Sequence, residues 1–214
     1  MCGAFAILHP FREEGRPFNA GYNGFDMPPR YNARPGQKLP VIFNTKPDEL
    51  QLALWGITPP WSKGKPLINA RKDSLDTKVT FYESFHKRRC IVPADAFYEW
   101  GVIKGVKIPF LFRMKTKSIF GFAGIWQEDP KSKEPAFTII TTDPNQLVGK
   151  IHDRMPAILQ PHREKEWLND RTDPRLLLDL LNPYPAHLME AYPVSSLVNS
   201  PKNDSPQIIK PIKI

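Results

Sequence analysis

The sequence predicts an α+β fold, in which a single compact domain has a mainly antiparallel, barrel-like sheet core and peripheral helices. Short strand-like segments dominate the chain after residue 90, which favours a sheet over a helical bundle. Of the 214 residues, 24 are proline, and this excess predicts many short elements joined by fixed turns. The length suits one core, residues 2–200, on which a C-terminal tail of residues 201–214 packs.

Local patterns give the elements of the first half. Residues 11–38 are rich in Pro, Gly, Asn and Arg, which is typical of a long ordered loop. Pro59 and Pro60 end regular structure because neither can donate to a sheet ladder. Val79, Tyr82 and Phe85 recur near helical spacing. The predicted elements are a strand over 2–8, the loop over 11–38, a strand pair over 41–43 and 50–55, and a helix over 79–88.

The second half alternates strands with short helices. Asp143 and Pro144 have the residue types of an N-cap and a first helical position. Gly105 marks a hairpin tip. The predicted elements are strands over 90–92, 96–100, 110–114, 119–126 and 137–142, a hairpin tip over 102–108, a helix over 144–150, a strand over 157–159, and a helical pair over 162–168 and 174–181.

Charge and cysteine usage narrow the function classes. The formal net charge of +8 makes a polyanionic partner plausible, with nucleic acid first, although a solvated basic surface would give the same charge. Cys2 and Cys90 lack CxxC or histidine spacing, which argues against a disulfide framework and a zinc site. The chain has no membrane-length apolar run and no signal sequence, so we expect a cytoplasmic protein, nucleoid-associated when bound to DNA.

Cys2 directly follows the initiator methionine. It is small enough for an aminopeptidase to remove Met1, which would give Cys2 a free α-amine beside its thiol. Both groups have usable unprotonated fractions near neutral pH. The amine can condense with an aldehyde, and the thiol can then close a five-membered ring on the same carbon. The alternative is a small, buried and inert cysteine in a first strand.

Glu99 lies within Phe97-Tyr98-Glu99-Trp100. Strand alternation places Phe97 and Glu99 on one face and Tyr98 and Trp100 on the other. A carboxylate among aromatic rings is poorly solvated, so we expect a raised pKa and a role as acid or base. An edge-strand glutamate facing water is the alternative.

Three further segments carry polar or aromatic side chains suited to a site. Asn69 and Arg71 share one face if their segment is extended, and could orient a reacting group and a phosphate. His152 and Arg154 point the same way, and histidine suits proton transfer. Trp61, held by two prolines, could stack on a base. A turn asparagine, a structural histidine and a tryptophan capping the core are the respective alternatives.

In this order and spacing the segments resemble the SOS response-associated peptidase (SRAP) family, also described as abasic-site processing proteins. The resemblance covers most of the chain. It is carried by Met1-Cys2-Gly3 with Phe5, Tyr31-Asn32-Ala33 with Pro35-Gly36-Gln37, Trp55-Gly56 to Pro60-Trp61, Ile68 to Arg71, Arg89 to Asp95, Phe97 to Trp100, Phe122 to Trp126, Thr138 to Thr142, His152 to Pro156, Val194-Ser195, Val198-Asn199 and Asn203-Asp204.

The resemblance implies covalent capture of abasic sites in single-stranded DNA through Cys2, with thiol autopeptidase activity exposing its amine and without a metal or organic cofactor. It implies that Asn69, Glu99 and His152 act with Cys2. The implied DNA contacts are Arg71, Arg154, Trp61, Pro35, Trp100 and Thr141. We expect a monomer that binds single-stranded DNA carrying abasic sites.

One departure and two alternatives remain. The family usually has an arginine at position four, where it helps hold DNA, whereas this chain has Ala4; a phosphate contact is therefore missing or supplied by another basic residue. An N-terminal-cysteine hydrolase of the glutamine amidotransferase type also begins Met-Cys-Gly, and Tyr22 to Phe25 weakly resembles its Asn-Gly motif. The second alternative is a non-covalent single-stranded DNA-binding protein.

Overall fold

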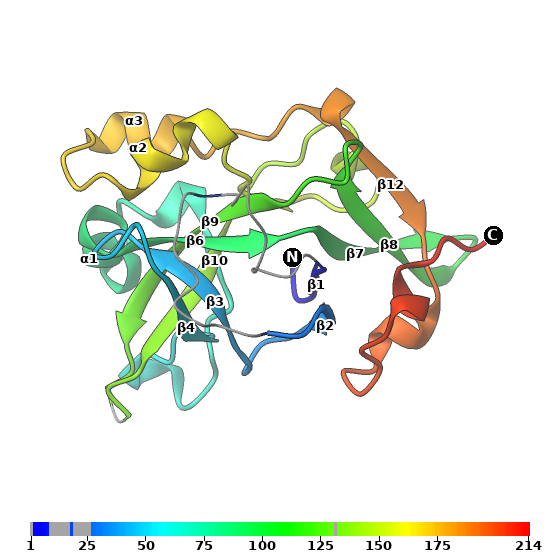
Figure 1. Ribbon diagram of the computed structural model, residues 1–214, viewed down its shortest axis with the longest axis horizontal. Coiled ribbons are helices and arrows are strands. Elements are labelled where there is room, and N and C mark those ends of the chain that lie inside the picture. Colours follow the sequence, from blue (N-terminus) through cyan, green and yellow to red (C-terminus); the bar gives the residue numbers. More distant parts are fainter. Residues whose placement is uncertain (1, 9–17, 19–26, 131) are drawn as a thin grey trace.

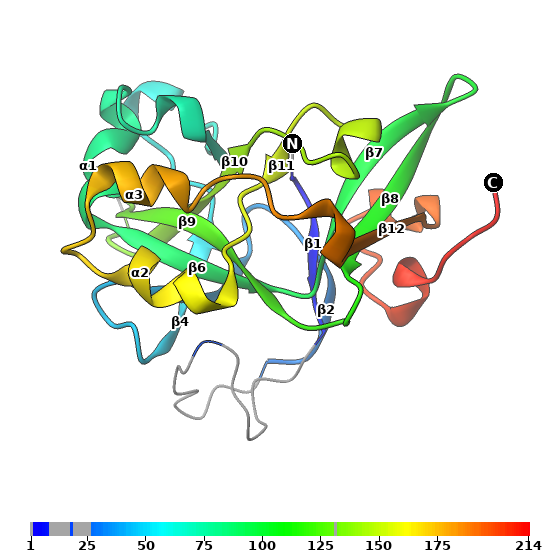
Figure 2. The same ribbon diagram turned by 90° about the horizontal axis from the view of Figure 1, so that it is seen from above.

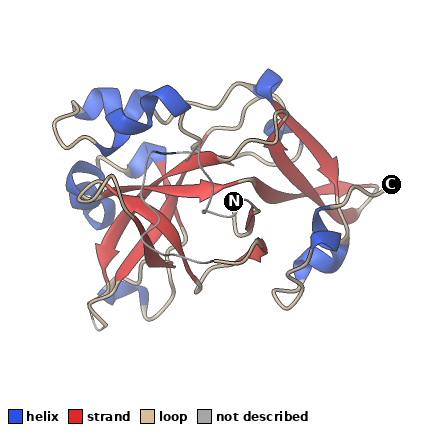
Figure 3. Cartoon of the chain, in the orientation of Figure 1, coloured by secondary structure: helices blue, strands red, loops and turns tan. Residues whose placement is uncertain are grey.

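The computed structural model describes residues 2–8, 18, 27–130 and 132–214. Strands form the centre and helices lie at the periphery (Figures 1 and 3). The strands are β1 (Phe5–Ile7), β2 (Arg30–Ala33), β3 (Lys38–Phe43), β4 (Leu50–Trp55), β5 (Asn69–Arg71), β6 (Arg89–Ala94), β7 (Ala96–Ile103), β8 (Val106–Met114), β9 (Phe120–Glu128), β10 (Pro135–Thr142), β11 (Met155–Pro156) and β12 (Met189–Pro193). The α-helices are α1 (Val79–Lys87), α2 (Glu164–Leu168) and α3 (Pro174–Asp179).

Five strands close into a barrel. The pairing runs β4–β3–β6–β9–β10 and returns to β4, with β10 parallel to β4 and the other pairs antiparallel. Its interior is aromatic, with Trp55, Phe122 and Phe137 fully buried. Gly124 on β9 permits the close approach of neighbouring strands, because an added Cβ would lie 2.8 Å from the Cys90 sulfur. The predicted barrel-like α+β class is confirmed.

A second sheet, in the order β12-β8-β7-β1-β2, stands beside the barrel. Figure 2 shows β1 running between the barrel and the long β7–β8 hairpin. The two faces of β1 enter different apolar clusters: Phe5 and Ile7 join the main core, whereas Ala4 and Ala6 join a smaller cluster with Tyr98. The N-terminal residues are therefore held on both sides.

A buried arginine ties the helices to the barrel. Arg89 is fully buried, and its guanidinium donates to the carbonyl oxygens of Phe85, His86, Trp167 and Asn169. These bonds compensate the desolvation of the charge and fasten the end of α1 and the end of α2 to β6. Within the described residues, no helix is long and apolar enough to cross a bilayer.

The C-terminal residues pack against the second sheet. Ile208 is fully buried in the cluster that contains Ala4. Asp204 accepts from the backbone N–H groups of Tyr31 and Asn32 and forms an ion pair with Arg30. The segment that follows β12 thus fixes the position of β2.

The expected strand pair, the helix at residue 79 and the β7–β8 hairpin are confirmed. The predicted loop over 11–38 is wrong at its end, because residues 30–33 form β2; residues 11–17 and 19–26 lie outside the described residues. The strand predicted over 157–159 is reduced to one antiparallel β-bridge, between Ile158 and Phe122, and the named strand lies just before it at Met155–Pro156. β12 was not expected.

The predicted helix over 144–150 is reduced to one 3₁₀ turn, Val148–Lys150. Asp143 does not cap this turn; instead the Asn145 side chain, two residues before its N-cap Leu147, accepts from the N–H groups of Leu147 and Val148. This side-chain bonding replaces the first helical turn.

Candidate active site around Cys2

Cys2 is fully buried at the entrance to β1. Its sulfur lies 3.7 Å from the carbonyl oxygen of Ala4. Burial raises the pKa of the Cys2 thiol well above its ordinary value and the negative charge of Glu99 raises it further, while the hydrogen bond to the Ala4 carbonyl and, more weakly, the Arg34 cation lower it. The thiol is therefore held in its protonated form.

Asn69 contacts the Cys2 backbone directly. Parallel pairing of β5 with β10 sets Asn69 opposite Ile139, and its Nδ2 donates to the Cys2 carbonyl oxygen at 2.9 Å. Its Oδ1 is buried and has no hydrogen-bond partner within the described part of the chain. The amide thus fixes the first residues with one end and offers a buried acceptor with the other. The predicted extended segment is confirmed.

Glu99 lies in the interior of β7 and is only 1% exposed. As expected from alternation, Phe97 belongs to the main core whereas Tyr98 and Trp100 pack against the smaller cluster. Burial raises the pKa of the Glu99 carboxyl, and nearby His152 partly offsets this effect. The edge-strand alternative is wrong, because Glu99 does not face water.

His152 approaches Glu99 from the loop after the 3₁₀ turn, with 3.9 Å between its Nε2 and the Glu99 Oε2. Gly101 makes room for this loop, since an added Cβ would lie 3.3 Å from two side-chain carbons of Ile151. His152 Nδ1 lies 3.0 Å from the Arg154 backbone nitrogen and 2.8 Å from Asp153 Oδ1. The imidazole ring is therefore held between Arg154 and Asp153 on one side and Glu99 on the other.

Arg154 and Thr141 form buried hydrogen bonds that support the segment carrying His152. Arg154 is 8% exposed; it donates to the Thr141 carbonyl oxygen at 2.6 Å and pairs with Asp73 at 3.1 Å. The Thr141 side chain is fully buried and donates to the Ala70 carbonyl oxygen. Arg71, by contrast, is exposed on β5. Of these three predicted contacts, Arg71 is the side chain that the fold presents to solvent.

Trp100 and Pro35 flank an arginine that the sequence did not single out. The guanidinium of Arg34 lies over the Trp100 ring, 5.8 Å from its centroid, and Trp100 Nε1 donates to Asn199 at 2.8 Å. Trp100 and Pro35 are both half-buried. Arg34 follows β2, and the pairing of β2 with β1, which the sequence did not predict, brings it to the site.

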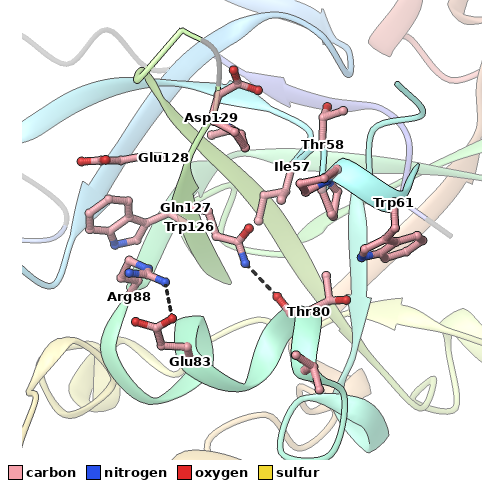
Figure 4. Close-up of a pocket in the computed structure, with 15 residues that line it drawn as sticks. Ile57, Thr58, Trp61, Thr80, Glu83, Arg88, Trp126, Gln127, Glu128 and Asp129 are labelled. Atoms are coloured by element: carbon pink, nitrogen blue, oxygen red, sulfur yellow. Dashed lines mark hydrogen bonds and ion pairs between the residues drawn. The ribbon is translucent and has the colours of Figure 1, made fainter. Parts of the chain in front are cut away.

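Trp61 stands apart from these groups, on the 3₁₀ helix Pro60–Ser62. Its side chain is 63% exposed, so the alternative of a tryptophan capping the core is wrong. It borders a pocket of about 620 Å³ (Figure 4), where Glu83 pairs with Arg88. Glu128 and Asp129 also line this pocket. These carboxylates would repel phosphates, so the ring of Trp61 is the part suited to contact a nucleic acid.

The family model of the SOS response associated peptidase (SRAP) matches residues 1–201. The chain belongs to this family. Among curated SRAP relatives, the abasic site processing protein YoqW of Bacillus subtilis is 44% identical over 223 residues, covering 98% of this chain and 99% of the relative. YedK of Escherichia coli, also named an abasic site processing protein, is 30% identical, covering 99% of this chain and 100% of the relative.

The fold is shared with solved structures. A crystal structure of a Bacteroides thetaiotaomicron protein superposes with a TM-score of 0.86 at 28% identity, covering 99% of this chain and 100% of that chain. The N-terminal strand, barrel and second sheet are therefore the SRAP architecture.

Proposed function

We propose that this SRAP protein processes abasic sites in single-stranded DNA by forming a covalent link through Cys2. The observation that carries the proposal is the meeting of three distant polar side chains at the N-terminus. Asn69 bonds the Cys2 carbonyl oxygen, Glu99 acts electrostatically on the Cys2 thiol, and His152 stands 3.9 Å from Glu99. The names of the relatives YoqW and YedK support the substrate class.

The first step needs a free amine. Removal of Met1, by an aminopeptidase or by the protein's own thiol peptidase activity, gives Cys2 an α-amino group. The buried Oδ1 of Asn69 is an acceptor that can orient this amine. The amine attacks C1′ of the open-chain sugar aldehyde and water leaves, giving an imine. His152, the more exposed member of its pair with Glu99 at 24%, supplies a proton for opening of the sugar ring or for the departing hydroxyl.

The second step uses the thiol. Because burial keeps the Cys2 thiol protonated, it needs a base when the imine is in place. Glu99 takes that proton and sulfur bonds to C1′ while the C=N π-electron pair moves to nitrogen. The nitrogen then receives the proton back from Glu99 and becomes the N–H of a thiazolidine ring. The same carboxyl shuttles protons during imine formation, for which its raised pKa suits it. The chemistry needs no metal or organic cofactor.

DNA would be recognised through its backbone and the missing base. Basic side chains such as Arg71 would contact phosphates without reading sequence. Trp61 and Trp100 would stack on bases beside the lesion, with Pro35 next to them. Arg154 and Thr141 would hold the loop that carries His152, and Arg154 would reach DNA only at its exposed margin.

Denaturing electrophoresis of the protein with single-stranded DNA containing one abasic site tests the proposal. We expect a stable adduct with the wild type and none with Cys2→Ala. Cys90→Ala is the matched control, because Cys90 is the other cysteine of the chain and is also fully buried; it should crosslink normally.

Intact mass measurement completes the test. The unmodified protein should lack Met1, and the adduct mass should equal protein plus DNA minus one water. A normal adduct from Cys2→Ala would refute the mechanism. Binding without any adduct would favour the non-covalent DNA-binding alternative, and glutaminase activity would favour the amidotransferase.

A further inference from the structure

Arg34 is held in one orientation by neutral groups. Its Nε donates to Asn32 Oδ1 at 2.7 Å, and its Nη2 donates to the carbonyl oxygen of Val198. The fully buried Asn32 is itself fixed by three hydrogen bonds from Nδ2 to backbone carbonyls, so it cannot swing away. The Trp100 ring supports the other side of the guanidinium. The guanidinium of Arg34 is therefore fixed in its orientation before any ligand binds.

The charge of Arg34 has no carboxylate partner in the part of the chain that the structure describes, and its Nη1 makes no hydrogen bond there. Burial lowers the pKa of Arg34, but the group stays a cation because arginine titrates so far above neutrality. Other half-buried arginines of this chain are neutralised: Arg113 by Glu190 at 2.7 Å and Arg163 by Glu166 at 2.5 Å. Arg34 is thus an anchored cation able to take an external anion.

Strand pairing sets this cation beside the reactive residue. The antiparallel β1–β2 register pairs Phe5 with Ala33, so Arg34, just after β2, lies next to Ala4, just before β1. Ala4 is fully buried in the apolar cluster that includes Val198, the residue whose carbonyl Arg34 contacts. Arg34 and Ala4 thus meet at the same residue of the smaller cluster, Val198.

We propose that Arg34 forms a phosphate-binding subsite directly beside Cys2, which takes a backbone phosphate adjacent to the abasic sugar. This inference rests on the proposed function. A guanidinium suits the role because it can keep its bonds to Asn32 and Val198 while directing its remaining N–H groups to a phosphate, which a lysine ammonium cannot. The phosphate would fix the position of the sugar relative to the Cys2 amine.

The salt dependence of binding isolates this contact. The probe is a single-stranded oligonucleotide with one tetrahydrofuran residue, which lacks the C1′ hydroxyl and cannot form an imine. Fluorescence anisotropy between about 50 and about 200 mM salt gives the slope of log K against log salt. Arg34→Gln should reduce its magnitude by about 0.7, the value for one phosphate on single-stranded DNA.

Two further variants complete the design. Arg34→Lys should keep the slope, because it keeps the charge, but bind roughly ten-fold more weakly, because it loses the anchoring bonds. Arg175→Gln is the matched control, since Arg175 is exposed on α3 and its side chain makes no hydrogen bond or ion pair within the described residues; it should leave the slope and affinity unchanged.

The outcomes separate this inference from the proposed function. An unchanged slope in Arg34→Gln, with normal binding by the wild type, overturns the inference and leaves the function standing. The inference is also wrong if Arg34→Gln shifts the pH profile of Cys2 alkylation without changing the slope, because Arg34 would then serve the thiol. Absence of an adduct between the wild type and abasic DNA would instead refute the proposed function.

Discussion

His152 Nε2 lies 3.9 Å from Glu99 Oε2, and the two side chains differ sharply in exposure: 24% for His152 and 2% for Glu99. The pair therefore links a buried carboxyl beside Cys2 to solvent. The other ring nitrogen, Nδ1, contacts the Arg154 N–H and the Asp153 carboxylate, which fix the orientation of the ring. In the proposed mechanism this pair would carry the protons that move during imine and thiazolidine formation.

Glu99→Gln should slow crosslinking by about 10²–10⁴-fold, the usual contribution of a general acid or base. Burial raises the pKa of Glu99, so its protonated form persists to higher pH than that of an ordinary glutamate. Any step that needs this acid should slow as pH rises through the raised pKa, and Glu99→Gln should abolish that limb. Single-turnover crosslinking rates from pH 5 to 9 check this. If Glu99→Gln kept the wild-type decrease in crosslinking rate at high pH, that decrease would belong to another titrating group.

Asn69→Ala should lower the crosslinking rate by about ten- to hundred-fold, because the Cys2 backbone loses its hydrogen-bonded support and small misplacements of a nucleophile are costly. Asn69→Asp tests the donor, since a carboxylate keeps the acceptor but cannot donate to the Cys2 carbonyl. Rates are compared at equal DNA occupancy. Wild-type rates in both variants would contradict a role for this amide.

Gly101→Val should impair crosslinking without touching any proposed reactive group. A Cβ alone would lie 3.3 Å from Ile151, so a valine must displace the loop that carries His152. We expect a loss of about ten-fold or more in rate, whereas binding to tetrahydrofuran-containing DNA should change little. Combining it with Ile151→Ala, which vacates the space, should recover part of the rate; no recovery would argue against this steric route.

Glu164→Gln should stabilise the protein at alkaline pH. Burial raises the pKa of Glu164 from 4.5 to about 8, so the folded state holds its proton while the unfolded state releases it. Stability therefore falls as pH rises from about 4.5 to about 8, by at most a few kcal/mol. Glutamine removes this loss. Urea unfolding at pH 5 and pH 9 should show a gain only at the higher pH.

Trp61→Ala should weaken single-stranded DNA binding by about 1–3 kcal/mol if its ring stacks on a base. Its exposure of 63% predicts little change in thermal stability. Val102→Ala is the control for removing an exposed apolar side chain, because Val102 lies near the tip of the β7–β8 hairpin and is 71% exposed. Equal DNA affinities in the two variants would place Trp61 outside the DNA contact.

Local patterns were sufficient for most strands and for α1, because alternation, helical spacing and proline act over a few residues. They failed where a side chain overrode propensity, as Asn145 does before the 3₁₀ turn. They also failed for β2 and β12, whose strands exist because of partners: β2 pairs with β1, and β12 pairs with β8. Such pairing joins residues far apart in the chain and leaves a weak local signal.

The sequence by itself predicted the kind of chemistry, an aminothiol at Cys2, and placed a glutamate among aromatic residues at position 99. Its resemblance to one family named Asn69 and His152 as their partners. Only the tertiary structure decided which groups face one another. Burial keeps the Cys2 thiol protonated and raises the pKa of Glu99, Arg154 becomes a support for His152, and β1–β2 pairing brings Arg34 beside Cys2. Desolvation and strand register are properties of the packed chain, so no local pattern could report them.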